Sequence, residues 1–326
     1  MAEGGETFAW PDHGQALRFA QHSSVAYCKD IPEIYAWNCL RCDFAPALHE
    51  GGREEWPPRR HHAPPPPPPP AHFHTDAVVY DVVHNVFGYT GVYDGTPILP
   101  TGRRRALVVA FRGTQSSSLK NWISDLRFVR LDLDWPFAPN GTNVTGVKVH
   151  SGFFRAYNHT ALRPNVTASV AKMLAASEEP AELHVTGHSL GAAIATVCAV
   201  DLALVFPKTP VYLWTYGSPR VGNYMFAKYA VGVLQKSTRV THAHDIVPSV
   251  PPTGLGFHHV AREVWQTRLQ LPEPPVGPPV QGMTVYEVCD GSGEDPLCHD
   301  GQCLLGQCFS VSDHLMYFDK GLLQSS

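Results

Sequence analysis

The stretch ELHVTGHSLGAAIATV, residues 182–197, decides the fold of this chain. It begins as an apolar, β-branched run typical of a buried strand and ends in small residues typical of a closely packed helix. Between the two, Gly187 and Gly191 flank Ser189. A serine on a sharp strand-to-helix turn needs such glycines, because the neighbouring backbone leaves no room for Cβ atoms. The turn exposes the hydroxyl at a helix N-terminus, which stabilises negative charge. We therefore predict that Ser189 is a nucleophile; the alternative is an ordinary tight turn.

Further apolar runs of strand length lie on both sides of this stretch. They cover residues 77–83, 106–111, 211–216 and 239–244. Helices are expected over residues 12–28 and 189–206. Near-continuous apolar strands separated by helices are typical of a mostly parallel sheet covered on both faces. Because 326 residues suit one large core, we predict a single α/β domain over residues 1–326.

A proline-rich stretch interrupts the pattern at about residues 43–75. It contains seven consecutive prolines, Pro64 to Pro70. Proline cannot donate to a sheet, so the stretch predicts an extended polyproline II spacer in an exposed insertion loop. A ligand for an SH3-type domain is the alternative.

A nucleophilic serine of this kind needs a base and a group that orients the base, in the chain order Ser, Asp or Glu, His. Asp245 follows the apolar run 239–244, and parallel sheets place their ligands at the carboxyl ends of strands. His314, further along the chain, supplies the imidazole. Asp313 adjoins His314 and cannot easily orient its ring. The sequence therefore favours Asp245 as the orienting carboxylate.

Other histidines are expected to have structural roles. His258 and His259 are rivals for the base, but they begin another expected strand, residues 258–265. His188 is expected to face away from the Ser189 hydroxyl, because side chains alternate direction along a strand and into the turn.

Composition excludes several classes of protein. A formal net charge of −4 gives no reason to expect nucleic acid or an anionic membrane as a partner. No apolar run approaches the roughly 18 residues that a membrane-spanning helix needs, so a soluble protein is expected. The oligomeric state is left open.

Four Asn-x-Thr acceptor sites and eight cysteines indicate an oxidising, secretory compartment. The acceptor asparagines are Asn140, Asn143, Asn158 and Asn165. The last two are seven residues apart in an expected helix, which would place two glycans on one face. Residues 1–25 contain no apolar core of a signal peptide, which fits a mature form or a misplaced start. Fortuitous acceptor sites in a cytosolic protein are the alternative.

Six short blocks follow one another along the chain. They are FRGT (111–114) with NWISD (121–125), VHSGF (149–153), GHSLG (187–191), YGSPRVGN (216–223), HDIVPSVPP (244–252) and DHLMYF (313–318). In this order they resemble the class 3, fungal-type triacylglycerol lipases, a family that also contains feruloyl esterases and phospholipases. The resemblance covers roughly residues 15–45 and 75–320, and it implies the α/β-hydrolase fold.

The resemblance also implies the site. It assigns Ser189, Asp245 and His314 as a catalytic triad. It further implies an oxyanion hole formed by the backbone N–H groups of Thr114 and Leu190, with the Thr114 hydroxyl assisting. This chemistry needs no metal or cofactor, and the sequence offers no metal-binding constellation.

An amphipathic helix is expected between the first two blocks, within residues 116–129. Its apolar positions have helical spacing and are Leu119, Trp122, Ile123 and Leu126. Core packing would explain this spacing, but the position resembles the family's mobile lid, whose apolar face covers the site in water. The segment between Thr114 and Trp122 is about two residues longer than is usual in the family.

An apolar lid favours lipid esters, so the first expectation is a triacylglycerol lipase. The alternatives are a phospholipase A1 or a feruloyl-type esterase with the same catalytic groups. A non-catalytic, lipid-binding relative is a remote alternative, because all three triad residues are present.

The resemblance implies two short disulfides, Cys39 with Cys42 and Cys289 with Cys298. Cys28 then needs Cys303 or Cys308, and one cysteine is left over. Cys198, inside the helix after Ser189, is expected to remain a buried thiol.

Overall fold

The computed structural model describes the parts of the chain that build a sheet and its covering helices. These are residues 12–28, 30–39, 41–42, 73–93, 105–115, 118–125, 129–132, 144–269, 283–303, 308–318 and 320–321. The predicted insertion over residues 43–75 lies outside them, except that its last three residues already belong to the first strand.

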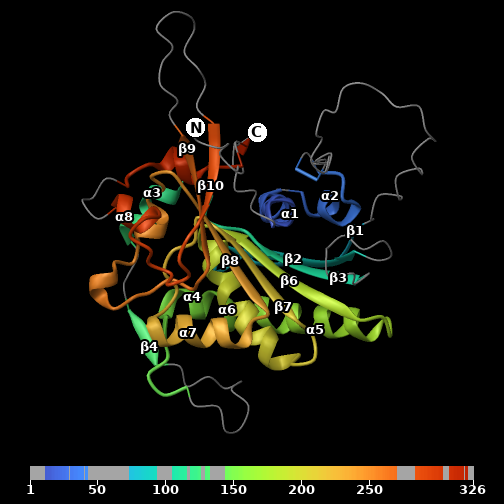
Figure 1. Ribbon diagram of the computed structural model, residues 1–326. Coiled ribbons are helices and arrows are strands. Elements are labelled where there is room, and N and C mark those ends of the chain that lie inside the picture. The colour runs from blue at the N-terminus through green and yellow to red at the C-terminus, as the bar shows by residue number, and fades with distance from the viewer. Residues whose placement is uncertain are drawn as a thin grey trace, which may run out of the picture.

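An eight-stranded sheet forms the centre of the fold, in the order β1-β2-β3-β6-β7-β8-β9-β10 (Figure 1). From β3 to β9 the neighbours pair parallel, whereas β1 and β2 at one edge and β10 at the other pair antiparallel. The strands are β1 (Phe73–Asp81), β2 (Val86–Tyr93), β3 (Arg105–Phe111), β6 (Ala181–His188), β7 (Val211–Tyr216), β8 (Lys236–His242), β9 (Glu263–Leu269) and β10 (Met283–Val288). Two small sheets pair β4 (Arg130–Asp132) with β5 (Lys148–His150), and β11 (Met316–Tyr317) with β12 (Lys320–Gly321).

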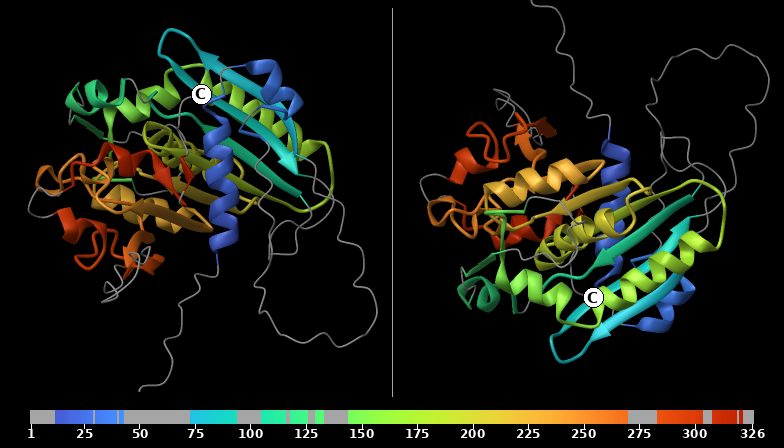
Figure 2. Two further views of the ribbon diagram at one scale, coloured as in Figure 1. Left: turned by 90° about the horizontal axis from the view of Figure 1, so that it is seen from above. Right: turned by 90° about the horizontal axis from the view of Figure 1, so that it is seen from below.

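Helices cover both faces of this sheet, which confirms the predicted α/β architecture (Figures 1 and 2). One face carries α1 (His13–Val25) and α2 (Ile31–Ala36). The other carries α4 (Ser151–Asn158), α5 (Leu162–Ala175), α6 (Leu190–Val205) and α7 (Tyr224–Val233). Shorter elements are α3 (Leu119–Asp125), α8 (His299–Cys303), α9 (Val311–His314) and the 3₁₀ turns η2 (Val247–Ser249) and η3 (Thr253–Leu255). None of the described helices is long and apolar enough to cross a membrane.

Strand β3 shows why the central strands are apolar along their whole length. Leu107 and Val109 pack into the core beneath α4–α7. Ala106 and Val108 pack into the second core, beneath α1. Because helices cover both faces, neither set of side chains can be polar. Helix α6, which follows the nucleophile turn, is buried from Gly191 to Leu202 and is apolar nearly all round.

Strand β2 is absent from the sequence-based prediction because two glycines interrupt its apolar run. The structure shows why those glycines are there. A Cβ on Gly88 would lie 2.7 Å from the Phe111 side chain, and a Cβ on Gly91 would lie 2.3 Å from the Phe73 ring. The aromatic rings of Phe111 and Phe73, from the two strands next to β2, therefore lie over these positions and leave no room for a side chain.

Two further expectations were wrong. The strand expected over residues 258–265 begins only at Glu263, because His259 turns inward and its Nε2 donates to the Pro248 carbonyl at 2.8 Å. Asn158 and Asn165 do not share one helix: the first ends α4 and the second lies in α5.

His22, on the sheet-facing side of α1, is a buried histidine held between two tyrosines. Its Nδ1 lies 2.7 Å from the Tyr89 hydroxyl and its Nε2 lies 2.8 Å from the Tyr93 hydroxyl. Burial, with smaller repulsion from Arg18 and His184, lowers the pKa of His22 to about 3. The unfolded chain instead takes up this proton near the ordinary histidine value of 6.5.

We therefore expect the free energy of unfolding to fall as the pH drops from 6.5 towards 3. In this window the unfolded state binds more protons than the folded state. Each histidine whose pKa is lowered by folding then reduces the free energy of unfolding by about 1.4 kcal/mol per pH unit. Urea unfolding at pH 7, 6, 5 and 4 measures the slope. His22→Gln should make it shallower, and the exposed-site control His74→Gln should not. Equal slopes in all three proteins would contradict the assignment.

Candidate active site

The turn between β6 and α6 places Ser189 in a backbone conformation that few side chains adopt. Its φ is 60° and its ψ is −129°. A Cβ on Gly187 would lie 2.3 Å from the Gly191 carbonyl oxygen, and a Cβ on Gly191 would lie 2.4 Å from that of Phe111. Both glycines are therefore required by close backbone approach, as the sequence pattern indicates.

A short pairing between two loops brings the carboxylate and the imidazole together. Asp245 follows β8, and its backbone forms a parallel bridge with Ser310. The Ser310 hydroxyl then caps α9 by accepting from the Asp313 N–H at 3.0 Å. This cap starts the single turn of helix that ends at His314.

His314 and Asp245 form a fully buried pair. Nδ1 of His314 lies 2.9 Å from each oxygen of the Asp245 carboxylate. The carboxylate also accepts from the Tyr317 hydroxyl at 2.6 Å and from the Val247 N–H at 2.8 Å. Burial alone would raise the pKa of Asp245. The positive charge of His314 and the hydrogen bonds from His314, Tyr317 and Val247 outweigh burial and hold the pKa below its ordinary value. Asp245 is thus ionised, and it orients the ring.

Three polar atoms of the residues predicted to be catalytic are buried and have no hydrogen-bond partner among the described residues. They are Ser189 Oγ, His314 Nε2 and Thr114 Oγ1. Thr114 follows Gly113, and a Cβ on Gly113 would lie only 2.9 Å from Cβ of Ser189. Buried polar groups are normally paired. A group of unpaired ones beside a strained serine is the arrangement of a reaction centre.

Next to Ser189, one chain of hydrogen bonds starts at His188 and connects the surrounding loops. Burial, with repulsion from His314, lowers the pKa of His188 to about 3, so its ring is neutral. Its Nε2 donates to the His314 carbonyl at 2.8 Å, and its Nδ1 accepts from the Tyr27 hydroxyl at 3.1 Å. Tyr27 in turn accepts from the Gly113 N–H at 3.0 Å. Both ring nitrogens of His188 are therefore occupied by contacts within the fold, which is a structural role.

Sequence reasoning missed three residues of this site, Tyr27, Gly217 and Tyr317. Gly217 has a φ of 55°, and a Cβ there would lie 2.8 Å from Asp245 Oδ2 and 2.9 Å from the His314 ring. The YGSPRVGN and DHLMYF blocks contain Gly217 and Tyr317, so the sequence held a signal for these two. Tyr27 lies in no block.

A groove of about 730 Å³ adjoins the turn at Ser189. Leu190 forms part of it, and Trp122 of α3 and Phe153 of α4 lie in its wall with ring centroids 6.4 Å apart. Its volume falls in the range of small-molecule sites. Of the expected lid residues, Leu119 is buried, Trp122 and Ile123 are half-buried, and Leu126 lies outside the described residues.

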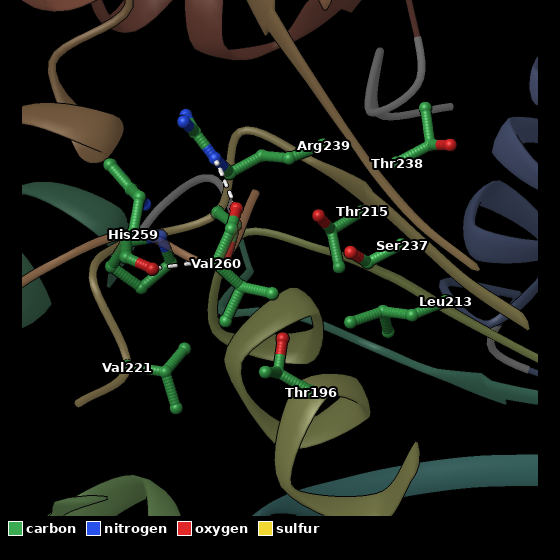
Figure 3. A pocket seen from close by; sticks show the side chains of 11 residues that line it. Thr196, Leu213, Thr215, Val221, Ser237, Thr238, Arg239, His259 and Val260 are labelled. Carbon is green, nitrogen blue, oxygen red and sulfur yellow. Dashed lines mark hydrogen bonds between the residues drawn. The ribbon is translucent and has the colours of Figure 1, made fainter. Parts of the chain in front are cut away.

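A second cavity, of about 10 Å³, lies between β7, β8 and α6 (Figure 3). Polar side chains line much of it, among them Thr196, Thr215, Arg239 and His259. It has the size of one water molecule and cannot hold an ester substrate.

Two groups of described residues have the side-chain types of a metal site. They are His299 with Cys303 and Cys308, and Asp295 with Cys289 and Cys298. In each group the two cysteines are bonded to each other. A disulfide offers no thiolate, which is the form that binds metals.

The disulfides correct one expectation. Cys39–Cys42 and Cys289–Cys298 form as expected, and Cys198 is a buried thiol. Cys28 does not pair with Cys303 or Cys308, because those two cysteines are bonded to each other across five positions of sequence. Cys28 remains a half-buried thiol.

The structure places the rival residues elsewhere. The Asp313 carboxylate accepts from the His244 N–H at 3.1 Å and does not contact the His314 ring. Nε2 of His258 donates to the Ser292 carbonyl at 2.9 Å. Of the glycan acceptors, Asn158 is half-buried and Asn165 is exposed, whereas Asn140 and Asn143 lie outside the described residues.

Comparison with known proteins agrees with this geometry. Residues 108–255 match the family model for class 3 lipases. The chain is similar to a lipase of Rhizomucor miehei, with 34% identity over 301 residues, covering 91% of this chain and 66% of that protein. It is also similar to secreted mono- and diacylglycerol lipase 1 of Fusarium solani, with 35% identity over 242 residues, covering 73% and 64%.

A solved triacylglycerol lipase, in which a serine protease triad forms the catalytic centre, has a similar structure. Its TM-score is 0.68 at 26% identity, covering 99% of this chain and 100% of that one. The sheet order and the strand–turn–helix that carries Ser189 define an α/β-hydrolase. Within that superfamily, the chain belongs to the class 3 lipase family. It spans just under two thirds of the length of the two curated relatives.

Proposed function

We propose that this protein is a serine carboxylester hydrolase that acts on acylglycerols through an acyl-enzyme on Ser189. One observation carries the proposal: a buried imidazole, His314, is held through Nδ1 by an ionised carboxylate, while its Nε2 and the Ser189 hydroxyl are left unpaired. An unpaired imidazole nitrogen and an unpaired hydroxyl are free to act on a substrate that binds between them.

The first half of the reaction forms the acyl-enzyme. A neutral hydroxyl is a poor nucleophile, so Nε2 of His314 accepts the Ser189 proton as the hydroxyl attacks the ester carbonyl. Asp245 stabilises the imidazolium that results. The backbone N–H groups of Thr114 and Leu190 hold the negative oxygen, and each such donor contributes about 10²–10³-fold to turnover. Collapse of the intermediate releases the alcohol, which takes the proton from His314.

The second half frees the enzyme. Water gives a proton to the same nitrogen of His314 and attacks the acyl-serine, and the acid leaves as the Ser189 hydroxyl is restored. No step needs a metal or cofactor.

The proposed lid is α3. Its Leu119 is buried, and its Trp122 and Ile123 are half-buried. Ser189 and His314 are fully buried, and Trp122 of α3 lines the groove next to Leu190, so we expect α3 to move when a bulky ester enters.

We also propose that the chain forms one hydrolase domain and acts in an oxidising compartment. Three disulfides among the described residues and the similarity to a secreted relative support this location. Glycans are proposed at Asn140, Asn143, Asn158 and Asn165. The substrate is an ester presented at a lipid–water interface.

The test is the rate of hydrolysis of a sparingly soluble triglyceride, measured at concentrations that cross its solubility limit. We expect a jump in rate at that limit, because an apolar lid moves most readily where it meets lipid. A smooth, saturable curve would indicate an esterase for soluble substrates. Hydrolysis of a phospholipid or a feruloyl ester in preference to the triglyceride would indicate one of those related activities.

A further inference from the structure

The turn between β1 and β2 exposes two adjacent valines. Val82 is 71% exposed, and Val83, at 89%, is the most exposed large apolar side chain among the described residues. Hairpin turns are normally built from Gly, Asn, Asp, Pro and Ser, which water solvates well. Folding therefore gives no account of these two side chains.

Polar neighbours hold the turn in a fixed shape. Asp81 Oδ1 accepts from both the backbone N–H and Nδ1 of His84, at 3.0 Å each. Asn85 has a φ of 51°, and Arg112 donates to its side-chain oxygen at 2.6 Å and to its backbone oxygen at 3.0 Å. The polar side chains of the turn are thus bonded to one another or inward, and the two valines are more exposed than His84, whose side chain is 53% exposed.

The turn also lies at the end of the sheet where the parallel strands finish, which is the end that carries the candidate active site. Because β1 is antiparallel to β2 and β2 is antiparallel to β3, β1 points in the same direction as β3 and β6. The carboxyl end of β1 therefore lies at the same end of the sheet as Ser189. Figure 2 shows the turn at the α3 end of the sheet. His84 and Val86, next to the valines, line the groove together with Trp122 and Leu190.

We propose that Val82 and Val83 form an anchor that inserts into the surface of a lipid aggregate and holds the mouth of the groove against it. The inference rests on the proposed function for its purpose. Two side chains are far too small a patch for a protein partner, which needs about 800 Å² of surface on each side. A lipid surface needs no matching patch, because each apolar side chain that enters it adds to the binding free energy. Arg112, two residues before Thr114, donates to Asn85 and so connects the turn that carries the anchor to the end of β3.

The test uses the double variant Val82→Asn/Val83→Asn in the full chain. Removing both apolar contacts should weaken partitioning onto phosphatidylcholine vesicles and triolein emulsions by about 10- to 100-fold. The matched control is Val205→Asn/Val231→Asn, which changes two exposed valines near the C-terminal ends of α6 and α7, away from the groove. The control should partition like the wild type. Both variants should keep kcat/KM for a soluble p-nitrophenyl ester within about twofold.

Vesicle partitioning needs no activity, so the anchor is tested even if every ester fails as a substrate. If Val82→Asn/Val83→Asn partitioned onto vesicles like the wild type, the inference would be overturned. Equal losses of partitioning in this variant and in the control, or loss of soluble-ester activity in this variant alone, would overturn it as well. A gain-of-function variant completes the test: Val83→Trp should bind vesicles several-fold more tightly and shift its fluorescence to shorter wavelength on binding.

Discussion

Replacing Ser189 with alanine is expected to lower kcat for ester hydrolysis by about 10⁶-fold. The loss is this large because the remaining groups have no nucleophile to activate; water bound in place of the hydroxyl is not held in line with the ester carbonyl. The fold should survive, since alanine keeps the same Cβ at a φ of 60° and loses a hydroxyl that has no partner among the described residues.

Initial rates on one soluble ester and one emulsified triglyceride measure the effect. The control is Ser177→Ala, on the loop after α5, where the hydroxyl only accepts from the Glu179 N–H at 3.1 Å. A phosphonate ester should label the wild type and the control at Ser189, and it should leave the Ser189→Ala variant unlabelled. Activity that persists in Ser189→Ala, or labelling at another serine, would exclude the proposed mechanism.

Replacing Asp245 with asparagine is expected to lower kcat by about 10⁴-fold. The Val247 N–H donates to Oδ1 of Asp245 and the Tyr317 hydroxyl to Oδ2. A backbone N–H can only donate, whereas a hydroxyl can also accept, so the amide oxygen should take the Oδ1 position and the NH₂ the Oδ2 position, where it faces Nδ1 of His314. An NH₂ group donates, so Nδ1 would have to accept and the ring proton would move to Nε2. The imidazole would then present N–H to Ser189 and could not take its proton.

The control for this substitution lies next to the base. Asp313 adjoins His314 in sequence, but its carboxylate accepts from the His244 backbone and not from the ring. Asp313→Asn should therefore reduce kcat by less than about tenfold. Profiles of kcat against pH for both variants separate a loss of the correct tautomer from a loss of fold. If Asp313→Asn proved the more damaging change, the orienting role would pass to Asp313.

Local patterns were sufficient to predict much of this protein. The strands over residues 106–111, 182–187 and 211–216 form within one or two residues of their predicted bounds. They could be predicted because strands covered on both faces must be apolar at every position. The turn around Ser189 could be predicted because the tight backbone passage demands glycine at two fixed positions.

Contacts across long stretches of sequence could not be predicted in this way. Tyr27 reaches a histidine 161 positions away and an N–H 86 positions away, and nothing in its own surroundings marks it. The pairing of Cys303 with Cys308 depends on the path of the chain between the C-terminal strands and α9. Periodicity says nothing about such a path.

The sequence alone therefore determined the α/β architecture, the nucleophile turn, and which carboxylate and histidine should accompany it. The tertiary structure decided how those groups are held. It brings Tyr317 and the Val247 N–H onto Asp245, leaves no space for a side chain at Gly217, and leaves Cys28 unpaired. The physical reason is one of range. Strand, helix and turn preferences act over a few residues, whereas the position of a buried polar group depends on every element that packs around it.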